Sequence, residues 1–244
     1  IHFLWSSATM QGQRDLSLES AQRVADNVRV EQVQQFPTIE FFRTVPILSM
    51  VRFGEWDMIL AQPKPFEDFK FAEAIWLYAR GVAFAAKGNP DSAAEALAQL
   101  IPLKEDVAVT FLDKRDYPGS LLVGIAIDLL QGEMAYRQGQ FNDAILHFER
   151  AVAAQDSLPY TEPPFWYYPS RQSLGAALLM AGRAADAEAV YRADLAQYRH
   201  NGWSMFGLMQ SLEAQNKLDE AQKVKTHFDA AWQFADIEIT ASIM

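Results

Sequence analysis

Histidine, cysteine and the carboxylates most often carry out chemistry in proteins, and in this sequence they are isolated or missing. The four histidines, His2, His147, His200 and His227, have no partner at the spacing of a helical metal motif. There is no cysteine, which excludes thiol catalysis, thiolate metal sites and disulfides. We therefore predict no metal site and no cofactor. The alternative is a metal site assembled from distant segments, with His2 as its first candidate.

Catalytic motifs are also missing. The sequence has no Gly-x-Ser-x-Gly nucleophile turn, no Walker phosphate loop and no dinucleotide-binding glycine pattern. Glu133 is a carboxylate that we expect in an apolar setting, where burial would raise its pKa. Arg137 follows four residues later, at the spacing of a helical ion pair. One paired acid does not make a catalytic centre, so the sequence predicts that the protein is not an enzyme.

The composition limits the classes of partner. Half of the 244 residues are hydrophobic, and the formal net charge is −10. An acidic chain without clustered Lys and Arg argues against a nucleic-acid partner. No apolar run reaches the roughly 18 residues that would span a bilayer. The sequence starts at Ile1 rather than Met, so we expect that an upstream segment is missing, and the compartment, cytoplasm or periplasm, stays open.

Glycines set the spacing of the helices that must position any site. Gly54 and Gly88 are 34 residues apart, as are Gly182 and Asn216, and each follows an apolar helix-like segment. Further small and large residues recur around these turns, with Gly132, Ala144 and Phe148 near Gly139, and Gly175, Ala187 and Tyr191 near Gly182. Small residues at such places let two antiparallel helices approach, and large residues fill the space between neighbouring pairs.

This pattern resembles the tetratricopeptide repeat family, whose period is 34 residues. The resemblance implies an all-α, right-handed superhelix of about six antiparallel helix pairs in a single domain. The units lie near residues 1–30, 40–62, 71–101, 125–156, 168–199 and 202–235. Pro46 is expected to kink or shorten the first helix of the second unit. Segments 52–56, 78–81 and 201–204 also look like the C-terminal part of large bacterial tetratricopeptide proteins, a likeness that implies no activity.

The family places its binding groove on the concave side, along the first helix of each unit. The matching positions here hold Ile75, Tyr78, Val82, Glu133, Tyr136, Arg137, Gln172, Trp203, Phe206, Gln210 and Glu213. Such a groove is aromatic and carries few charges. The Lys, Asn and Arg clamp that some family members use for a terminal carboxylate is absent, so an acidic C-terminal peptide is not expected. In the alternative interpretation, several of these side chains face neighbouring helices.

A second candidate surface is the loop 159–169, in which prolines flank consecutive aromatic residues. Trp166, Tyr167 and Tyr168 on a stiff loop would bind a partner at a small cost in entropy, with Arg171 projecting nearby. In the alternative interpretation, these rings fill the seam between the fourth and fifth units.

We therefore predict a non-catalytic scaffold that binds a protein or extended peptide through the aromatic groove and the 159–169 loop. One alternative is a receptor for a small molecule or metal ligand in the same groove. Another is an accessory domain of an enzyme whose catalytic part lies upstream of residue 1. The helix of the last unit should continue through Trp232, Phe234 and Ala235, and the tail 236–244 should cap the last unit or dock on another subunit. The oligomeric state stays open.

Overall fold

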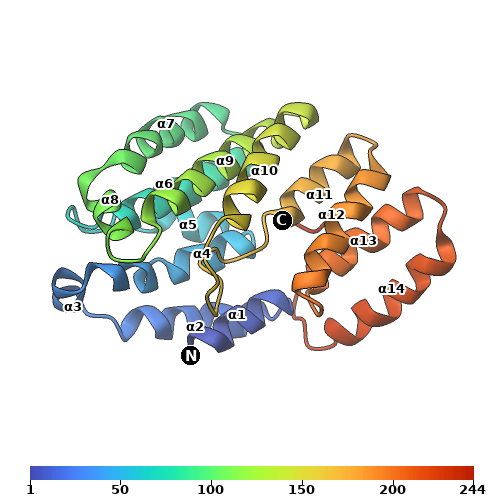
Figure 1. The fold of residues 1–244 in the computed structure, drawn as a ribbon, viewed down its shortest axis with the longest axis horizontal. Helices are drawn as coiled ribbons and strands as arrows, with labels where there is room; N and C mark the ends of the chain where they lie inside the picture. Colours follow the sequence, from blue (N-terminus) through green and yellow to red (C-terminus); the bar gives the residue numbers. More distant parts are fainter.

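The computed structural model describes all of residues 1–244, and its regular secondary structure consists of helices without any strand (Figure 1). Six antiparallel pairs follow one another along the chain, and the two helices of each pair are in contact. The pairs are α1 (His2–Met10) with α2 (Arg14–Asp26), α4 (Val45–Arg52) with α5 (Trp56–Ala61), α6 (Lys70–Ala86) with α7 (Pro90–Leu100), α9 (Gly119–Arg137) with α10 (Phe141–Asp156), α11 (Arg171–Met180) with α12 (Ala184–Gln197), and α13 (Gly202–Ala214) with α14 (Leu218–Ala231). The predicted all-α class and number of helix pairs are confirmed.

The turns inside the pairs lie where the sequence spacing places them. Gly88, Gly139 and Gly182 have φ angles of 73° to 74°, in the left-handed region that ends a helix with glycine at little cost. Asn216 takes the corresponding place in the last pair with a φ of 59°. No helix is both long and apolar enough to cross a membrane.

Close helix packing depends on glycines that face large rings. A Cβ atom on Gly132 would lie 2.4 Å from the ring of Phe148. Cβ atoms on Gly175 and Gly207 would lie 2.3 and 2.2 Å from Tyr191, whose ring is fully buried. The small-to-large pattern in the sequence therefore marks real contacts between helices.

The pattern is less regular in the first half of the chain. Pro46 lies in the first turn of α4, and this helix has only eight residues, so the expected shortening is observed. A short helix, α3 (Val30–Gln35), and a 3₁₀ helix, η1 (Pro37–Arg43), precede it. The long connection after α7 forms a 3₁₀ helix, η2 (Ile101–Glu105), and α8 (Val107–Asp113), before α9 begins at Gly119.

The first and last helix pairs contact each other. The indole Nε1 of Trp203 in α13 donates a hydrogen bond to the carbonyl oxygen of Thr9 in α1, at 3.0 Å. Arg52 at the end of α4 lies with its guanidinium 3.6 Å from the Trp203 ring centroid. Trp232 packs against Gly12, which has no room for a Cβ atom. The two ends of the repeat array therefore support each other.

The C-terminal tail differs from the expectation. Helix α14 ends at Ala231, before Trp232, and the chain then turns toward the inside of the molecule. The carboxylate of Asp236 accepts hydrogen bonds from the main-chain N–H groups of Arg14 and Asp15 at the N-terminus of α2. Figure 1 shows the C-terminus in the middle of the molecule, near α4 and α11. The tail therefore contacts α2 as well as α13 of the last pair, and its role as a terminal cap stays a prediction.

Candidate functional site

The tail 237–244 is a non-helical segment that crosses the first helices of the last three pairs. The side chain of Gln210 in α13 donates to the carbonyl oxygen of Thr240, at 2.9 Å. The hydroxyl of Ser242 donates to the carbonyl oxygen of Gln172 in α11, at 2.8 Å. The guanidinium of Arg137 in α9 donates to the carbonyl oxygen of Met244. Residues 240, 242 and 244 of the tail therefore bond in turn to α13, α11 and α9. The tail runs from the last helix pair back toward the earlier ones.

Ser242 is the most deeply buried residue of the tail, with 1% of its surface exposed. Besides its bond to Gln172, its hydroxyl lies 2.7 Å from the phenol oxygen of Tyr191. Tyr191 comes from α12 and reaches the tail because Gly175 and Gly207 leave space for its ring. The serine therefore occupies a slot made by α11, α12 and α13.

A small cavity of about 30 Å³ lies under the last two residues of the tail. Arg52, Tyr78, Tyr167, Tyr168 and Glu133 contribute to its wall, which Ile243 and Met244 complete. Burial raises the pKa of Glu133, and the guanidinium of Arg137, 2.7 Å from its Oε1, opposes that shift. The expected ion pair and the apolar setting of Glu133 are both found.

A buried polar chain lies behind this cavity. Arg52 Nη2 donates to Gln172 Oε1 at 2.5 Å, and Gln172 Nε2 donates to Ser204 Oγ at 3.0 Å. Ser204 in turn donates to Asp194. Burial lowers the pKa of Arg52 to about 10 and raises that of Asp194 to about 6. Hydrogen bonds thus link a buried cation to a buried acid and join α4 to α11, α12 and α13.

The predicted groove residues are mostly not open to solvent. Tyr78, Gln172 and Trp203 are 2%, 0% and 0% exposed. Tyr136, Phe206 and Gln210 are half-buried. The expectation of an open aromatic groove is therefore wrong, because the first helices pack on their neighbours and the tail covers part of what remains. Glu133, Arg137, Gln172 and Gln210 do converge on the tail or on the cavity beneath it.

The loop 159–169 behaves as the alternative interpretation describes. Trp166, Tyr167 and Tyr168 are 3%, 6% and 9% exposed and belong to the main hydrophobic core. The phenol oxygens of Tyr167 and Tyr78 are 3.0 Å apart. These rings cannot meet a partner while the core is intact. Arg171 is half-buried and forms two hydrogen bonds with the carboxylate of Asp156.

Sequence reasoning missed Arg52, Asp194 and Ser242. Tyr191 was identified only as a large packing residue, although its hydroxyl meets the tail. Its position opposite Gly175 was visible in the repeat pattern, but the contact with residue 242 depends on where the tail folds. No local signal in the tail reveals that contact.

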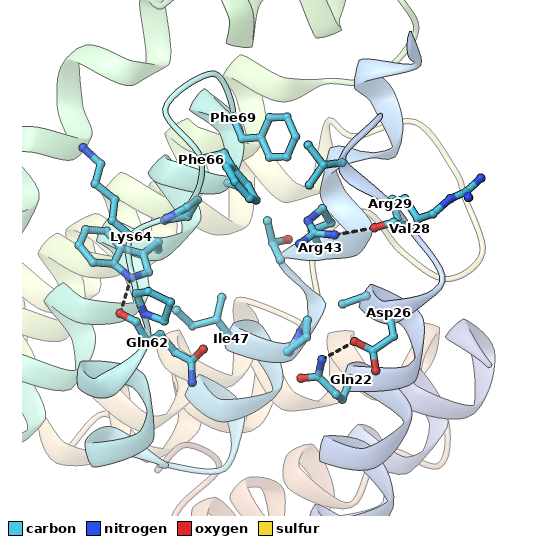
Figure 2. A pocket seen from close by; sticks show the side chains of 18 of the residues that line it. Gln22, Asp26, Val28, Arg29, Arg43, Ile47, Gln62, Lys64, Phe66 and Phe69 are labelled. Carbon is cyan, nitrogen blue, oxygen red and sulfur yellow. Dashed lines mark hydrogen bonds between the residues drawn. The ribbon is translucent and has the colours of Figure 1, made fainter. Parts of the chain in front are cut away.

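A larger cavity, with a volume of about 890 Å³, lies elsewhere (Figure 2). It is bordered by α2, α3 and the 62–69 loop, with Phe66 and Phe69 on one wall. Arg43 donates to the carbonyl oxygen of Val28 at 2.5 Å, and the nearby Asp26 accepts from Gln22. None of the predicted site residues lies in this cavity.

The histidines do not come together with other side chains that could bind a metal ion. His2 stacks on Trp5 with ring centroids 5.3 Å apart, and burial lowers its pKa to about 4. His147 lies 3.9 Å from a carboxylate oxygen of Asp128. No three His, Asp or Glu side chains come together as a metal-ligand group.

Comparisons with known proteins add little to this geometry. No family model and no curated protein matches the chain. Two solved structures are similar: a Podosopora anserina kinesin light chain-like protein of nearly identical TPR-like repeats, and a single-substitution variant of it. The variant has a TM-score of 0.48 at 16% identity, over 91% of this chain and 95% of its own. The parent has a TM-score of 0.47 at 16% identity, over 93% and 99%.

These scores are too low to carry an argument about fold or function. The architecture follows from the molecule itself, from its six helix pairs, its left-handed turn residues and its glycine-to-ring contacts. Together they make this chain an α-solenoid of antiparallel helix pairs.

Proposed function

We propose that this chain is a non-catalytic scaffold that holds an extended segment of a partner protein or peptide along α9, α11 and α13. The observation that carries the proposal is the position of the chain's own tail, which lies across these helices and bonds to each of them. The tail stands for the partner's segment in this arrangement.

The contacts are of a kind that another segment can reproduce. Gln210 donates to the main-chain carbonyl oxygen of Thr240, a group that every peptide offers, and Arg137 donates to the main-chain oxygen of Met244. Binding through the main chain with a few side-chain pockets is a recurring way to recognise extended peptides. The tail is also the partner's competitor, because a short tether gives it an effective concentration in the millimolar range. A partner must therefore displace the tail.

The test uses the full chain with a protease site inserted between Asp236 and Ile237, so that the protein folds before the tail is cut. A fluorescein-labelled peptide of residues 237–244 is then titrated into cut and uncut protein, and fluorescence anisotropy is measured. We expect saturable binding to the cut protein and at least tenfold weaker binding to the uncut protein, since its tethered tail competes.

A peptide of the same composition in scrambled order is the control. The proposal is wrong if the cut protein does not take up the 237–244 peptide, or if it takes up the scrambled peptide equally well. Equal binding to cut and uncut protein would place the peptide outside the groove and would also contradict the proposal.

A second candidate function, a small-molecule receptor, is favoured by a different cavity. A space of about 540 Å³ lies between α1 and the outer part of the 158–169 segment. Phe3 and Tyr160, which line it, are 61% and 84% exposed. Aromatic walls of this kind suit a flat, uncharged ligand. Native mass spectrometry before and after denaturation tests this function: a retained small mass that Phe3→Ala abolishes would support it, and a bare mass would count against it.

A further inference from the structure

We infer that the groove selects segments with a serine at the place of Ser242, followed by two apolar residues. This inference rests on the proposed function and concerns which segments the groove accepts. Thr240 and Met244 are bound through main-chain oxygens, so their side chains are not read by these bonds. Ser242 is bound through its side chain.

The direction of the two bonds follows from the single proton of the hydroxyl. The Ser242 hydroxyl donates to the carbonyl oxygen of Gln172, so its oxygen must accept from the phenol of Tyr191. A side chain in this slot must therefore both donate and accept. Alanine does neither, and a carboxylate cannot donate.

The size of the slot is set by helix packing. The ring of Tyr191 is wedged between α11 and α13, where Cβ atoms on Gly175 and Gly207 would lie 2.3 and 2.2 Å from its Cζ. The ring has no space to withdraw, so its hydroxyl has a fixed position. Ser242 is 1% exposed, which leaves little room for a larger side chain.

The apolar residues that follow have their own place. Ile243 and Met244 close the small cavity over Arg52, Tyr78 and Tyr168. The side chain of Met244 approaches Gly54, where a Cβ atom would lie 3.3 Å from its Cε. A polar residue at these positions of a ligand would leave the apolar part of this wall uncovered, which carries a cost in free energy.

The Ser242 hydroxyl makes a measurable contribution to affinity because its loss leaves the buried Tyr191 hydroxyl without a hydrogen-bond partner. In an alanine peptide, Tyr191 would keep a buried hydroxyl with no acceptor from the tail. Such a group costs about 1–3 kcal/mol, which corresponds to about 5- to 150-fold in affinity. Changing Tyr191 to phenylalanine removes that hydroxyl and leaves the ring, so it should remove most of the discrimination.

The experiment is a double-mutant cycle on the cut protein. Labelled 237–244 peptides with serine or alanine at position 242 are titrated into the parent protein and into Tyr191→Phe, and four dissociation constants are measured. We expect alanine to weaken binding at least fivefold in the parent and by a smaller factor in Tyr191→Phe, where only the bond to the Gln172 carbonyl oxygen is lost. Circular dichroism melting confirms that Tyr191→Phe is folded.

Different outcomes contradict the proposed function and the inferred selectivity. If the parent protein does not bind the serine peptide, the proposed function is wrong. If it binds the serine and alanine peptides equally, the groove binds extended segments but the inferred selectivity is wrong. If alanine costs as much in Tyr191→Phe as in the parent, Tyr191 does not read the hydroxyl and the inference is wrong. The comparison of the serine and alanine peptides on the parent protein leaves the protein unchanged, so this part of the test does not depend on the folding of a variant.

Discussion

Two irregular segments enter the interior of this helical chain, and they are held by different kinds of contact. The loop 159–169 contributes Trp166, Tyr167 and Tyr168 to the main core, where rings pack at 4.8 to 5.6 Å from one another or from Tyr78. The tail 237–244 contributes one fully buried residue, Ser242, and is held mainly by hydrogen bonds from side chains. The loop is therefore part of the hydrophobic core, whereas the tail is held by polar contacts that another segment or water could replace.

The largest expected effect is on the loop side. Trp166→Ala should destabilise the whole protein by about 3–5 kcal/mol, because it empties a buried ring site that neighbouring residues cannot refill. Chemical denaturation followed by circular dichroism measures this change. Tyr160→Ala, at an 84% exposed position of the same segment, is the control and should change stability by less than about 0.5 kcal/mol. A small effect of Trp166→Ala would mean that the loop, like the tail, is separable from the fold.

The next effect comes from the buried acid behind the groove. Burial raises the pKa of Asp194 from 3.8 to about 6, so the folded protein holds this proton more tightly than the unfolded chain. The contribution of Asp194 to the free energy of unfolding is therefore fully present below about pH 4, and it is lost as the pH rises through about 6. The loss amounts to about 3 kcal/mol.

Asp194→Asn should remove this part of the pH dependence, because an amide keeps a hydrogen-bond acceptor for Ser204 and does not titrate. Unfolding free energies measured between pH 4 and 7 test the prediction. Asp186→Asn, at an exposed position of the same helix, is the control. An unchanged slope in Asp194→Asn would mean that this acid keeps an ordinary pKa in the folded protein.

A smaller effect should separate the tail from the fold directly. In Gly207→Ala, the new methyl group would lie 2.2 Å from Tyr191 Cζ, so the ring and the hydroxyl that meets the tail must shift away from α13. We expect the free energy of unfolding to fall by about 1–3 kcal/mol and hydrogen exchange to become faster in residues 240–244. Gly124→Ala is the matched control, because its nearest neighbour would be the flexible end of Lys104 at 3.6 Å. Tail exchange that stays unchanged in Gly207→Ala would contradict the role given to Tyr191.

The sequence predicted the helix pairs because their determinants are local. Gly139 and Gly182 mark the turns, and Gly132 and Gly175 face Phe148 and Tyr191 at a fixed offset in the repeat. The site could not be predicted in the same way. The family pattern identified Arg137, Gln172 and Gln210, but the burial of Tyr78 and Trp203 depends on long-range closure of the chain. The tail's path depends on contacts between residues up to 222 positions apart, such as Arg14 with Asp236.

The smallest effect concerns a single bond of the tail and tests how separable it is. Gln210→Ala removes the donor to the Thr240 carbonyl oxygen at a part-exposed place, where water can replace the lost bond. We expect the tail to open about two- to fivefold more often, which corresponds to about 0.5–1 kcal/mol, while the melting temperature changes little. Hydrogen exchange read by mass spectrometry measures the opening, and Gln222→Ala at an exposed position of α14 is the control. If Gln210→Ala lowers global stability as much as it loosens the tail, the tail unfolds only together with the body. It would then belong to the fold, like the loop.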